Sequence, residues 1–220
     1  MTRDKVSDLL KIIAILTMLI DHIGAVFFPN LLIFRIVGRL SFPIFAYLLV
    51  LGYFRTSNLK RYIARLLIFG IVSQVPYTLL FGLRLNIYFT LIVGLYFIYY
   101  LDNMTSNIYD NRFLILLCTM PLTLVSDYGL YGVFTIVLFF YYLSEDVEFN
   151  RKHLIIFFTL TTLIYSIITG AYIQLFSILS LYIILNLKLK LSCKLRLNKY
   201  LAYSIYPIHL TIFYIFKVIA

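Results

Sequence analysis

The sequence predicts an all-α integral membrane protein, a polytopic bundle of about nine transmembrane helices that forms one domain over residues 1–220. Of its 220 residues, 63% are hydrophobic and 13% are charged, whereas an average soluble domain is about half apolar and a quarter charged. Long apolar segments recur from Leu9 to the C-terminus, without the short alternating strands of a membrane β-barrel. Because backbone groups in lipid must bond within their own segment, these segments favour helices.

The expected helices follow from the lengths of the apolar segments, since about 20 residues cross the hydrocarbon core at a rise of about 1.5 Å each. The first segment has a basic start like a signal peptide, but no small-residue cleavage site follows, so we expect a retained helix. Several later segments are shorter than an ideal span, and we expect some of them to tilt, re-enter or merge. The expected ranges are 9–28, 31–54, 61–82, 86–101, 112–126, 130–143, 153–169, 171–187 and 200–218.

Two basic loops predict the orientation of the bundle. Residues 55–65 and 188–199 are rich in lysine and arginine, and such loops favour the cytoplasmic side. They follow the second and the eighth expected helix, so both are cytoplasmic when the N-terminus is also cytoplasmic. The net charge of +10 is then explained by topology, and we expect contact with membrane lipid and no nucleic-acid partner.

Ionisable residues inside an apolar span are costly and are commonly functional. Asp21 and His22 lie in the first expected helix, and Arg35 and Arg39 share one face of the second because they are four residues apart. We expect all four in the outer half of the bilayer. His22 is a candidate general base because histidine titrates near neutrality. The alternatives are a helix-capping pair for Asp21 and His22, and a structural ion-pair cluster or snorkelling for the arginines. Gly38 and the Ser-Phe-Pro sequence at 41–43 indicate a break in the second helix.

Further polar candidates lie where the other segments end or bend. Gln74 closes the third expected helix, Asn86 opens the fourth, and Asp127 joins the fifth and sixth. Asp127 is a candidate to orient His22 or to pair with an arginine, or it is an ordinary turn residue. His209 follows Pro207 in the last helix, and it is either a second catalytic group or a neutral histidine bonded to a neighbouring helix. We expect no metal site, since the sequence has no His-Glu-x-x-His motif.

Several stretches resemble the TraX family in that family's order. They are LKIIAILTMLIDHIGAVFFP, RIVGRLSFPIFAYLLVLGY, RYIARLLIFGIVSQVPY, LNIYFTLIVGL, SDYGLYGVFTIVLFFYYL and YSIYPIHLTIFYIF. The family takes its name from a conjugation protein that acetylates the N-terminus of pilin subunits in the membrane. It looks related to integral membrane acyltransferases that use acyl-CoA donors.

The resemblance implies an acetyl-CoA-dependent acyltransferase in the bacterial cytoplasmic membrane. Its acceptor would be an amine or hydroxyl of an unknown protein, peptide or glycan. On that basis His22 is the expected base, Asp21 or Asp127 orients it or holds an arginine, and Arg35 and Arg39 stabilise the thioester oxygen or bind the donor. His209 remains a second catalytic candidate, with Asn86 and Gln74 as weaker binding candidates. Two alternatives use the same residues: a transporter or channel, and a non-catalytic membrane assembly protein.

Overall fold

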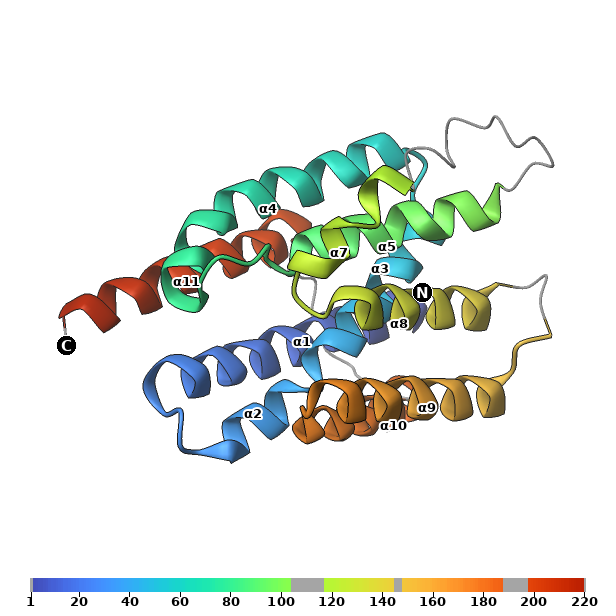
Figure 1. The fold of residues 1–220 in the computed structure, drawn as a ribbon. Helices are drawn as coiled ribbons and strands as arrows, with labels where there is room; N and C mark the ends of the chain where they lie inside the picture. Colours follow the sequence, from blue (N-terminus) through green and yellow to red (C-terminus); the bar gives the residue numbers. More distant parts are fainter. Residues whose placement is uncertain (1, 104–116, 145–147, 188–197, 220) are drawn as a thin grey trace. The chain divides into compact units, whose positions relative to one another are not determined.

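The computed structural model describes residues 2–103, 117–144, 148–187 and 198–219, and over these residues it is helical apart from turns and one isolated bridge between Leu85 and Ser126 (Figure 1). The described helices, in chain order, are α1 (Thr2–Phe27), α2 (Leu32–Gly38), α3 (Ser41–Arg55), α4 (Leu59–Phe81), α5 (Ile87–Asp102), α7 (Leu122–Val125), α8 (Gly129–Leu143), α9 (Arg151–Thr169), the 3₁₀ helix η1 (Tyr172–Ile178), α10 (Leu179–Asn186) and α11 (Lys199–Ile219).

Most of the expected segments coincide with helices to within two residues, although four differ. The first expected helix, 9–28, begins seven residues earlier, at Thr2, and ends at Phe27. The segment 31–54 is interrupted at residues 39–40, between α2 and α3, which confirms the break expected near Gly38. The segment 171–187 begins as the 3₁₀ helix η1 and becomes α-helical at Leu179. Of the expected helix 112–126, residues 112–116 lie outside the described residues, and a turn at 120–121 precedes the four-residue helix α7.

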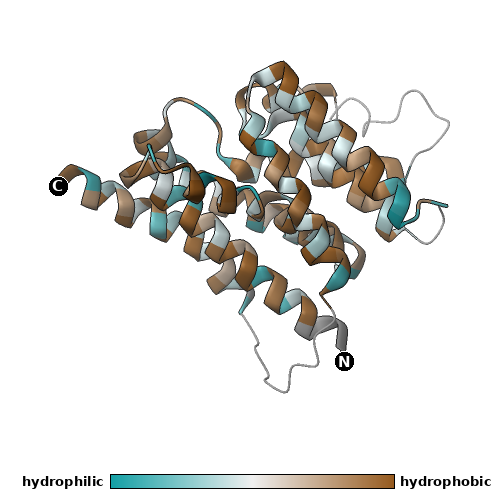
Figure 2. Ribbon diagram, turned by 90° about the horizontal axis from the view of Figure 1, so that it is seen from below, coloured by the Kyte–Doolittle hydropathy of each residue, from teal (hydrophilic) through white to brown (hydrophobic). Residues whose placement is uncertain are grey.

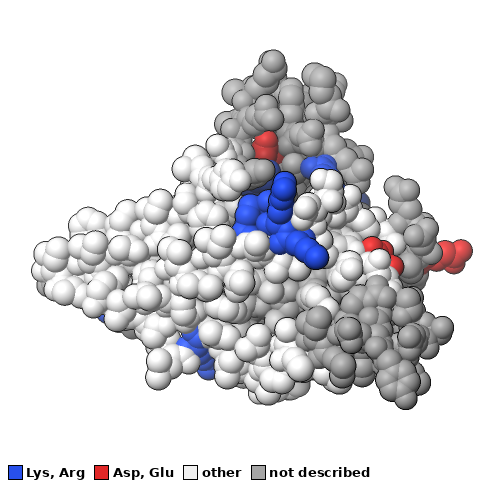
Figure 3. Space-filling view, turned by 90° about the horizontal axis from the view of Figure 1, so that it is seen from above, with Lys and Arg blue, Asp and Glu red and all other residues white. Residues whose placement is uncertain are grey.

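The helices identify a membrane protein. Large apolar side chains are exposed along α4, α9 and α11, and Figure 2 shows hydrophobic residues over most of the ribbon. Charged side chains occupy little of the described surface in Figure 3. The count of nine crossings and the cytoplasmic N-terminus remain predictions. In the described part of the chain, five segments are long and apolar enough to span a bilayer: Val6–Phe27, Leu32–Arg55, Leu59–Phe81, Arg151–Thr169 and Tyr200–Ile219.

One compact unit consists of Met1–Leu48 and Ile155–Ala220. Within it α1 packs against α2 and α11, and α2 packs against η1. The contact between α1 and α2 is close because it has glycines on both sides. A Cβ atom on Gly24 would lie 2.3 Å from the Cβ of Phe34, and one on Gly38 would lie 2.0 Å from a carboxylate oxygen of Asp21. Small residues at helix contacts let backbones approach closely in membranes.

The other compact unit is Leu49–Leu154, in which α5 packs against α4, α7 and α8. Gly94 of α5 lets Ile136 of α8 lie against its backbone, where an added Cβ would be 2.3 Å from a methyl carbon. Leu95, Ile98 and Phe139 are fully buried beside this contact. The prediction of one domain over residues 1–220 concerns the whole chain and remains a prediction.

Candidate functional site

A single carboxylate joins α1 to α2 through two arginines. Asp21 is buried, with 8% of its surface exposed. Its Oδ2 lies 2.7 Å from Nη1 of Arg35, and its Oδ1 accepts a hydrogen bond of 2.8 Å from Nη2 of Arg39. Nη1 of Arg35 also donates to the backbone carbonyl of Asp21, at 3.2 Å. Both arginines therefore pair with Asp21, one of the two carboxylates expected to be available to them, and the i, i+4 spacing places both guanidiniums on its side of α2.

Local sequence explains why the carboxylate fits there. Gly38 lies between the two arginines in sequence, at the end of α2, and Asp21 packs directly on its backbone. Ser41, at the start of α3, donates a hydrogen bond of 2.9 Å to the carbonyl of Ala14 in α1. The turn at residues 39–40 is thus held against α1 by a hydrogen bond on one side and an ion pair on the other.

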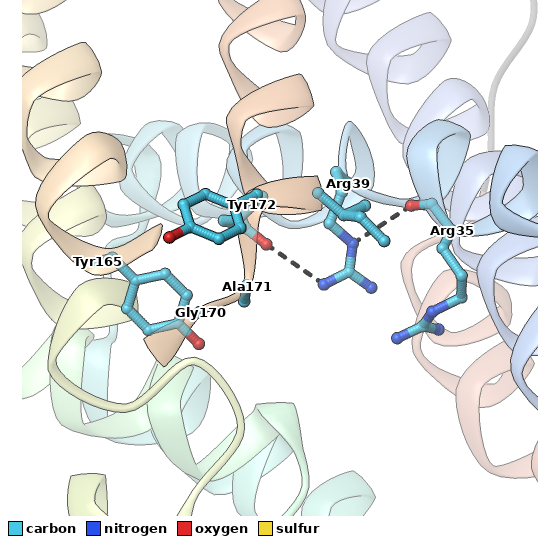
Figure 4. Close-up of a pocket in the computed structure, with 8 residues that line it drawn as sticks. Arg35, Arg39, Tyr165, Gly170, Ala171 and Tyr172 are labelled. Atoms are coloured by element: carbon cyan, nitrogen blue, oxygen red, sulfur yellow. Dashed lines mark hydrogen bonds between the residues drawn. The ribbon is translucent and has the colours of Figure 1, made fainter. Parts of the chain in front are cut away.

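A pocket opens beside the same arginines (Figure 4). Arg39 donates from Nη1 to the side-chain oxygen of Gln174, at 3.2 Å, and from Nε to the carbonyl of Arg35, at 3.3 Å. Gln174 is 2% exposed and lies in η1. The cavity has a volume of about 310 Å³, within the usual range for small-ligand sites. It is lined by Arg35, Arg39, Tyr165, Gly170, Ala171, Tyr172, Ile173 and Gln174.

The residue after Asp21 forms a histidine pair with the last helix. Nδ1 of His22 lies 2.6 Å from Nε2 of His209, and the two rings are stacked with centroids 4.9 Å apart. The other ring nitrogen of His209, Nδ1, lies 2.7 Å from the carbonyl oxygen of Ile205, one turn earlier in α11. Tyr206 and Phe213 of the same helix contact the ring of His209 edge-on. His209, expected to bond a neighbouring helix or to act as a second group, therefore contacts His22.

These contacts define the proton positions of the neutral pair. A carbonyl oxygen only accepts, so Nδ1 of His209 must carry a proton and donate it to Ile205. A neutral imidazole has one donor and one acceptor, so Nε2 of His209 accepts. Nδ1 of His22 is then the donor in the 2.6 Å contact. This assignment leaves the lone pair of His22 on Nε2.

Two of the other expected residues meet in the second unit. Nδ2 of Asn86 donates to the carbonyl of Gly70, at 2.8 Å, and to the side-chain oxygen of Gln74, at 2.9 Å. Asn86 is fully buried, and its side-chain oxygen accepts from the backbone N–H of Tyr88 as the N-cap of α5. Nε2 of Gln74 donates to the carbonyl of Arg84, at 2.7 Å. These bonds fasten the turn between α4 and α5, and the proposed binding roles of Asn86 and Gln74 remain predictions.

Asp127 belongs to the same unit. Its backbone N–H donates to the carbonyl of Leu85, at 3.0 Å, and its carbonyl accepts from the hydroxyl of Thr90. Its carboxylate is hydrogen-bonded to the side chain of Tyr77 in α4. Asp127 therefore connects the loop before α5 with the loop before α8, and the role proposed for it toward His22 remains a prediction.

Sequence reasoning missed the pocket walls from α9 and η1. Gln174 could have been identified as a candidate in the same way as Gln74, because it is an amide within an apolar segment. Tyr165 and Tyr172 are two of 20 tyrosines, and nothing in the sequence distinguishes them from the others. In the described residues, no group of three or more His, Cys, Asp or Glu side chains is placed to hold a metal ion.

Comparison with known proteins then decides the family. The family model described as "TraX protein" matches residues 6–217. The chain belongs to the TraX family. It is 30% identical over 166 residues to an uncharacterized protein of Rickettsia prowazekii. The aligned region covers 72% of this chain and 64% of the relative. It is also 38% identical over 73 residues to the probable fimbrial assembly protein FimC, serogroup H1, of Dichelobacter nodosus. This aligned region covers 31% of this chain and 30% of the relative.

This TraX chain thus spans less than two thirds of the length of either relative. No solved structure matches it. Membership in the TraX family agrees with the resemblance carried by the Asp-His pair of the first helix and the two arginines of the second, and the match extends over nearly the whole chain.

Proposed function

We propose that this TraX protein is a membrane-embedded acyltransferase that transfers an acetyl group from acetyl-CoA to an amine or hydroxyl of a membrane-associated or exported acceptor. It would act in the bacterial cytoplasmic membrane. The observation that carries the proposal is the histidine pair, because its hydrogen bonds place the proton of His22 on Nδ1 and make Nε2 the basic nitrogen. Family membership supports the class of reaction.

The reaction would proceed by direct attack. The acceptor nitrogen or oxygen forms a bond to the thioester carbonyl carbon as its proton passes to Nε2 of His22. Collapse of the tetrahedral intermediate breaks the carbon–sulfur bond, and the same proton returns to the departing CoA thiolate. Atoms and charge balance, and His22 ends neutral. His209 holds the His22 ring through the 2.6 Å contact and supports the imidazolium that forms transiently.

The arginines favour the same step. Arg35 and Arg39 share the carboxylate of Asp21, so the three side chains together carry one net positive charge, and Asp21 directly precedes His22 in sequence. Positive charge fixed in place stabilises the negative charge that develops on the carbonyl oxygen. Asp21 reduces the repulsion between the guanidiniums and keeps them on one side of α2.

The test uses the protein purified in detergent with isotopically labelled acetyl-CoA, candidate acceptors from the host membrane, and mass spectrometry of the products. We expect His22→Ala to reduce acetyl transfer by about 10²-fold or more, the usual contribution of a general base. His209→Gln should reduce it less, since an amide can still accept from Nδ1 of His22. Unchanged turnover in His22→Ala would refute the proposed base. His153→Gln, at a half-buried position in the first turn of α9, is the matched control.

A second candidate is a non-catalytic role in membrane assembly, favoured by the similarity to the probable fimbrial assembly protein of Dichelobacter nodosus. In that case the Asp21–Arg39 contact would be purely structural. Exchanging the two charges in an Asp21→Arg, Arg39→Asp variant would preserve the function of an assembly protein and abolish acetyl transfer by an enzyme. Stabilisation of the purified protein by CoA would favour the enzyme.

A further inference from the structure

The pocket beside α2 is lined by an arginine, Arg35, that keeps N–H groups available for a ligand. Arg35 contacts Asp21 only through Nη1, and within the described part of the chain its Nη2 and Nε donate no hydrogen bond. About 32% of its side chain is exposed, and it lines the pocket. Figure 4 shows its guanidinium on one side of the opening, with Tyr165 and Tyr172 on the other. A guanidinium presents its N–H groups in a planar fork that matches an oxyanion.

Charge points to the same class of ligand. Two guanidiniums share one carboxylate here, which leaves a net positive charge in a segment long and apolar enough to span a bilayer. Uncompensated charge in such a segment is costly unless it meets a counter-ion or a water-filled cavity. Nη1 of Arg39 is already bonded to Gln174 and its Nη2 to Asp21, so Arg35 is the arginine placed to receive a ligand.

We infer that this pocket binds an oxyanion, a phosphate or a carboxylate, carried by the molecule that is acylated. Assignment to the acceptor rests on the proposed function. The carbonyl of Asp21, which accepts from Arg35, is joined directly to the backbone nitrogen of the candidate base His22. The phosphates of an acyl-CoA are separated from its thioester by the whole pantetheine arm, so a phosphate subsite whose arginine bonds the residue before the base suits the acceptor and not the donor.

The anion site is tested without turnover. The purified full-length protein is heated in detergent with increasing inorganic phosphate or acetate, with chloride adjusted to keep ionic strength constant, and the unfolding midpoint is recorded. We expect a saturable rise of the midpoint, which linkage converts to an affinity. Arg35→Gln should weaken that affinity about tenfold or more, as expected for the loss of a charge-assisted hydrogen bond. Arg35→Lys should retain part of it.

Matched variants keep the result interpretable. Arg84→Gln removes the same charge from an exposed loop and should bind phosphate as the unaltered protein does. His22→Ala should also bind phosphate normally, which separates failure of the anion site from failure of the proposed base. If Arg35→Gln does not unfold cooperatively, Arg35→Lys and Tyr172→Ala provide the comparison, with weaker phosphate binding expected in both.

Three outcomes would overturn the inference. The first is that neither phosphate nor acetate raises the unfolding midpoint in a saturable way. The second is that Arg84→Gln weakens phosphate affinity as much as Arg35→Gln does, which would indicate an adventitious ion only. The third concerns the affinity for the donor, which is measured with free CoA through the same shift of the unfolding midpoint. We expect Arg35→Gln to change CoA affinity less than twofold, roughly the limit of a lost weak contact, and a loss equal to that for phosphate would assign the pocket to the donor.

Discussion

Removing the charge of Asp21 should be among the most destabilising single changes in this chain. Asparagine keeps the shape of the side chain and leaves two guanidiniums without their counter-charge. The carboxylate is 12% exposed and the Arg39 side chain 15%, so solvent compensates little for that pair. Breaking a buried ion pair by removing one partner costs about 3–5 kcal/mol. The Arg35 contact adds little to this figure, because that side chain is 32% exposed and is partly screened.

The measurement is the free energy of unfolding in mixed micelles, titrated with a denaturing detergent and followed by circular dichroism. Asp8→Asn is the control in the same helix, since Asp8 pairs at 2.7 Å with Lys11, which is 34% exposed. Asp8 itself is 13% exposed, but its single partner is partly screened by solvent, so the loss should lie nearer the about 0–1 kcal/mol of a surface pair than that for Asp21→Asn. Equal effects of Asp21→Asn and Asp8→Asn would refute the reasoning. Adding Arg39→Gln to Asp21→Asn should recover part of the loss, because it removes an uncompensated charge.

Two glycine substitutions test how closely the helices approach one another, and two asparagine substitutions test a helix cap. Gly38→Ala places a Cβ 2.0 Å from the carboxylate of Asp21 and should cost about 1–3 kcal/mol by overpacking. Gly70→Ala, whose Cβ would lie 3.0 Å from Tyr88, should cost less in the same unfolding titration, and the reverse order would contradict these helix contacts. Asn86→Ala removes a buried N-cap and should cost about 1–3 kcal/mol. The exposed Asn103→Ala should cost less than about 0.5 kcal/mol, and an equal loss would count against a structural role for Asn86.

The positions of the helices could be predicted from the sequence because each depends on a local property. A long apolar segment in lipid must satisfy its own backbone, so its helical state follows from its composition. The break between α2 and α3 followed in the same way from Gly38 and the Pro43 region. The 3₁₀ geometry of η1 did not follow, since the residues of 171–187 are as apolar as those of a regular helix.

The pairing of polar residues was predictable only in part. The spacing of Arg35 and Arg39 placed them on one face. Their charge required a carboxylate, carbonyl or phosphate partner, and Asp21 was one of two available carboxylates. The contact of His22 with His209 joins residues 187 positions apart, and it depends on how α1 packs against α11. No local pattern contains that information, so His209 was recognised as polar and costly without its partner being identified.

In each unit a buried polar side chain contacts the backbone of a glycine. In the first, the carboxylate of Asp21 lies against the backbone of Gly38, and in the second the amide of Asn86 donates to the carbonyl of Gly70. In hydrocarbon, a polar side chain without a partner is costly, and a neighbouring backbone is within reach only where no side chain intervenes. At Gly38 the missing side chain therefore leaves room for the buried carboxylate of Asp21. In the second unit the contacts of the Asn86 amide hold a turn together, whereas in the first unit the Asp21 carboxylate also holds two arginines that line a pocket.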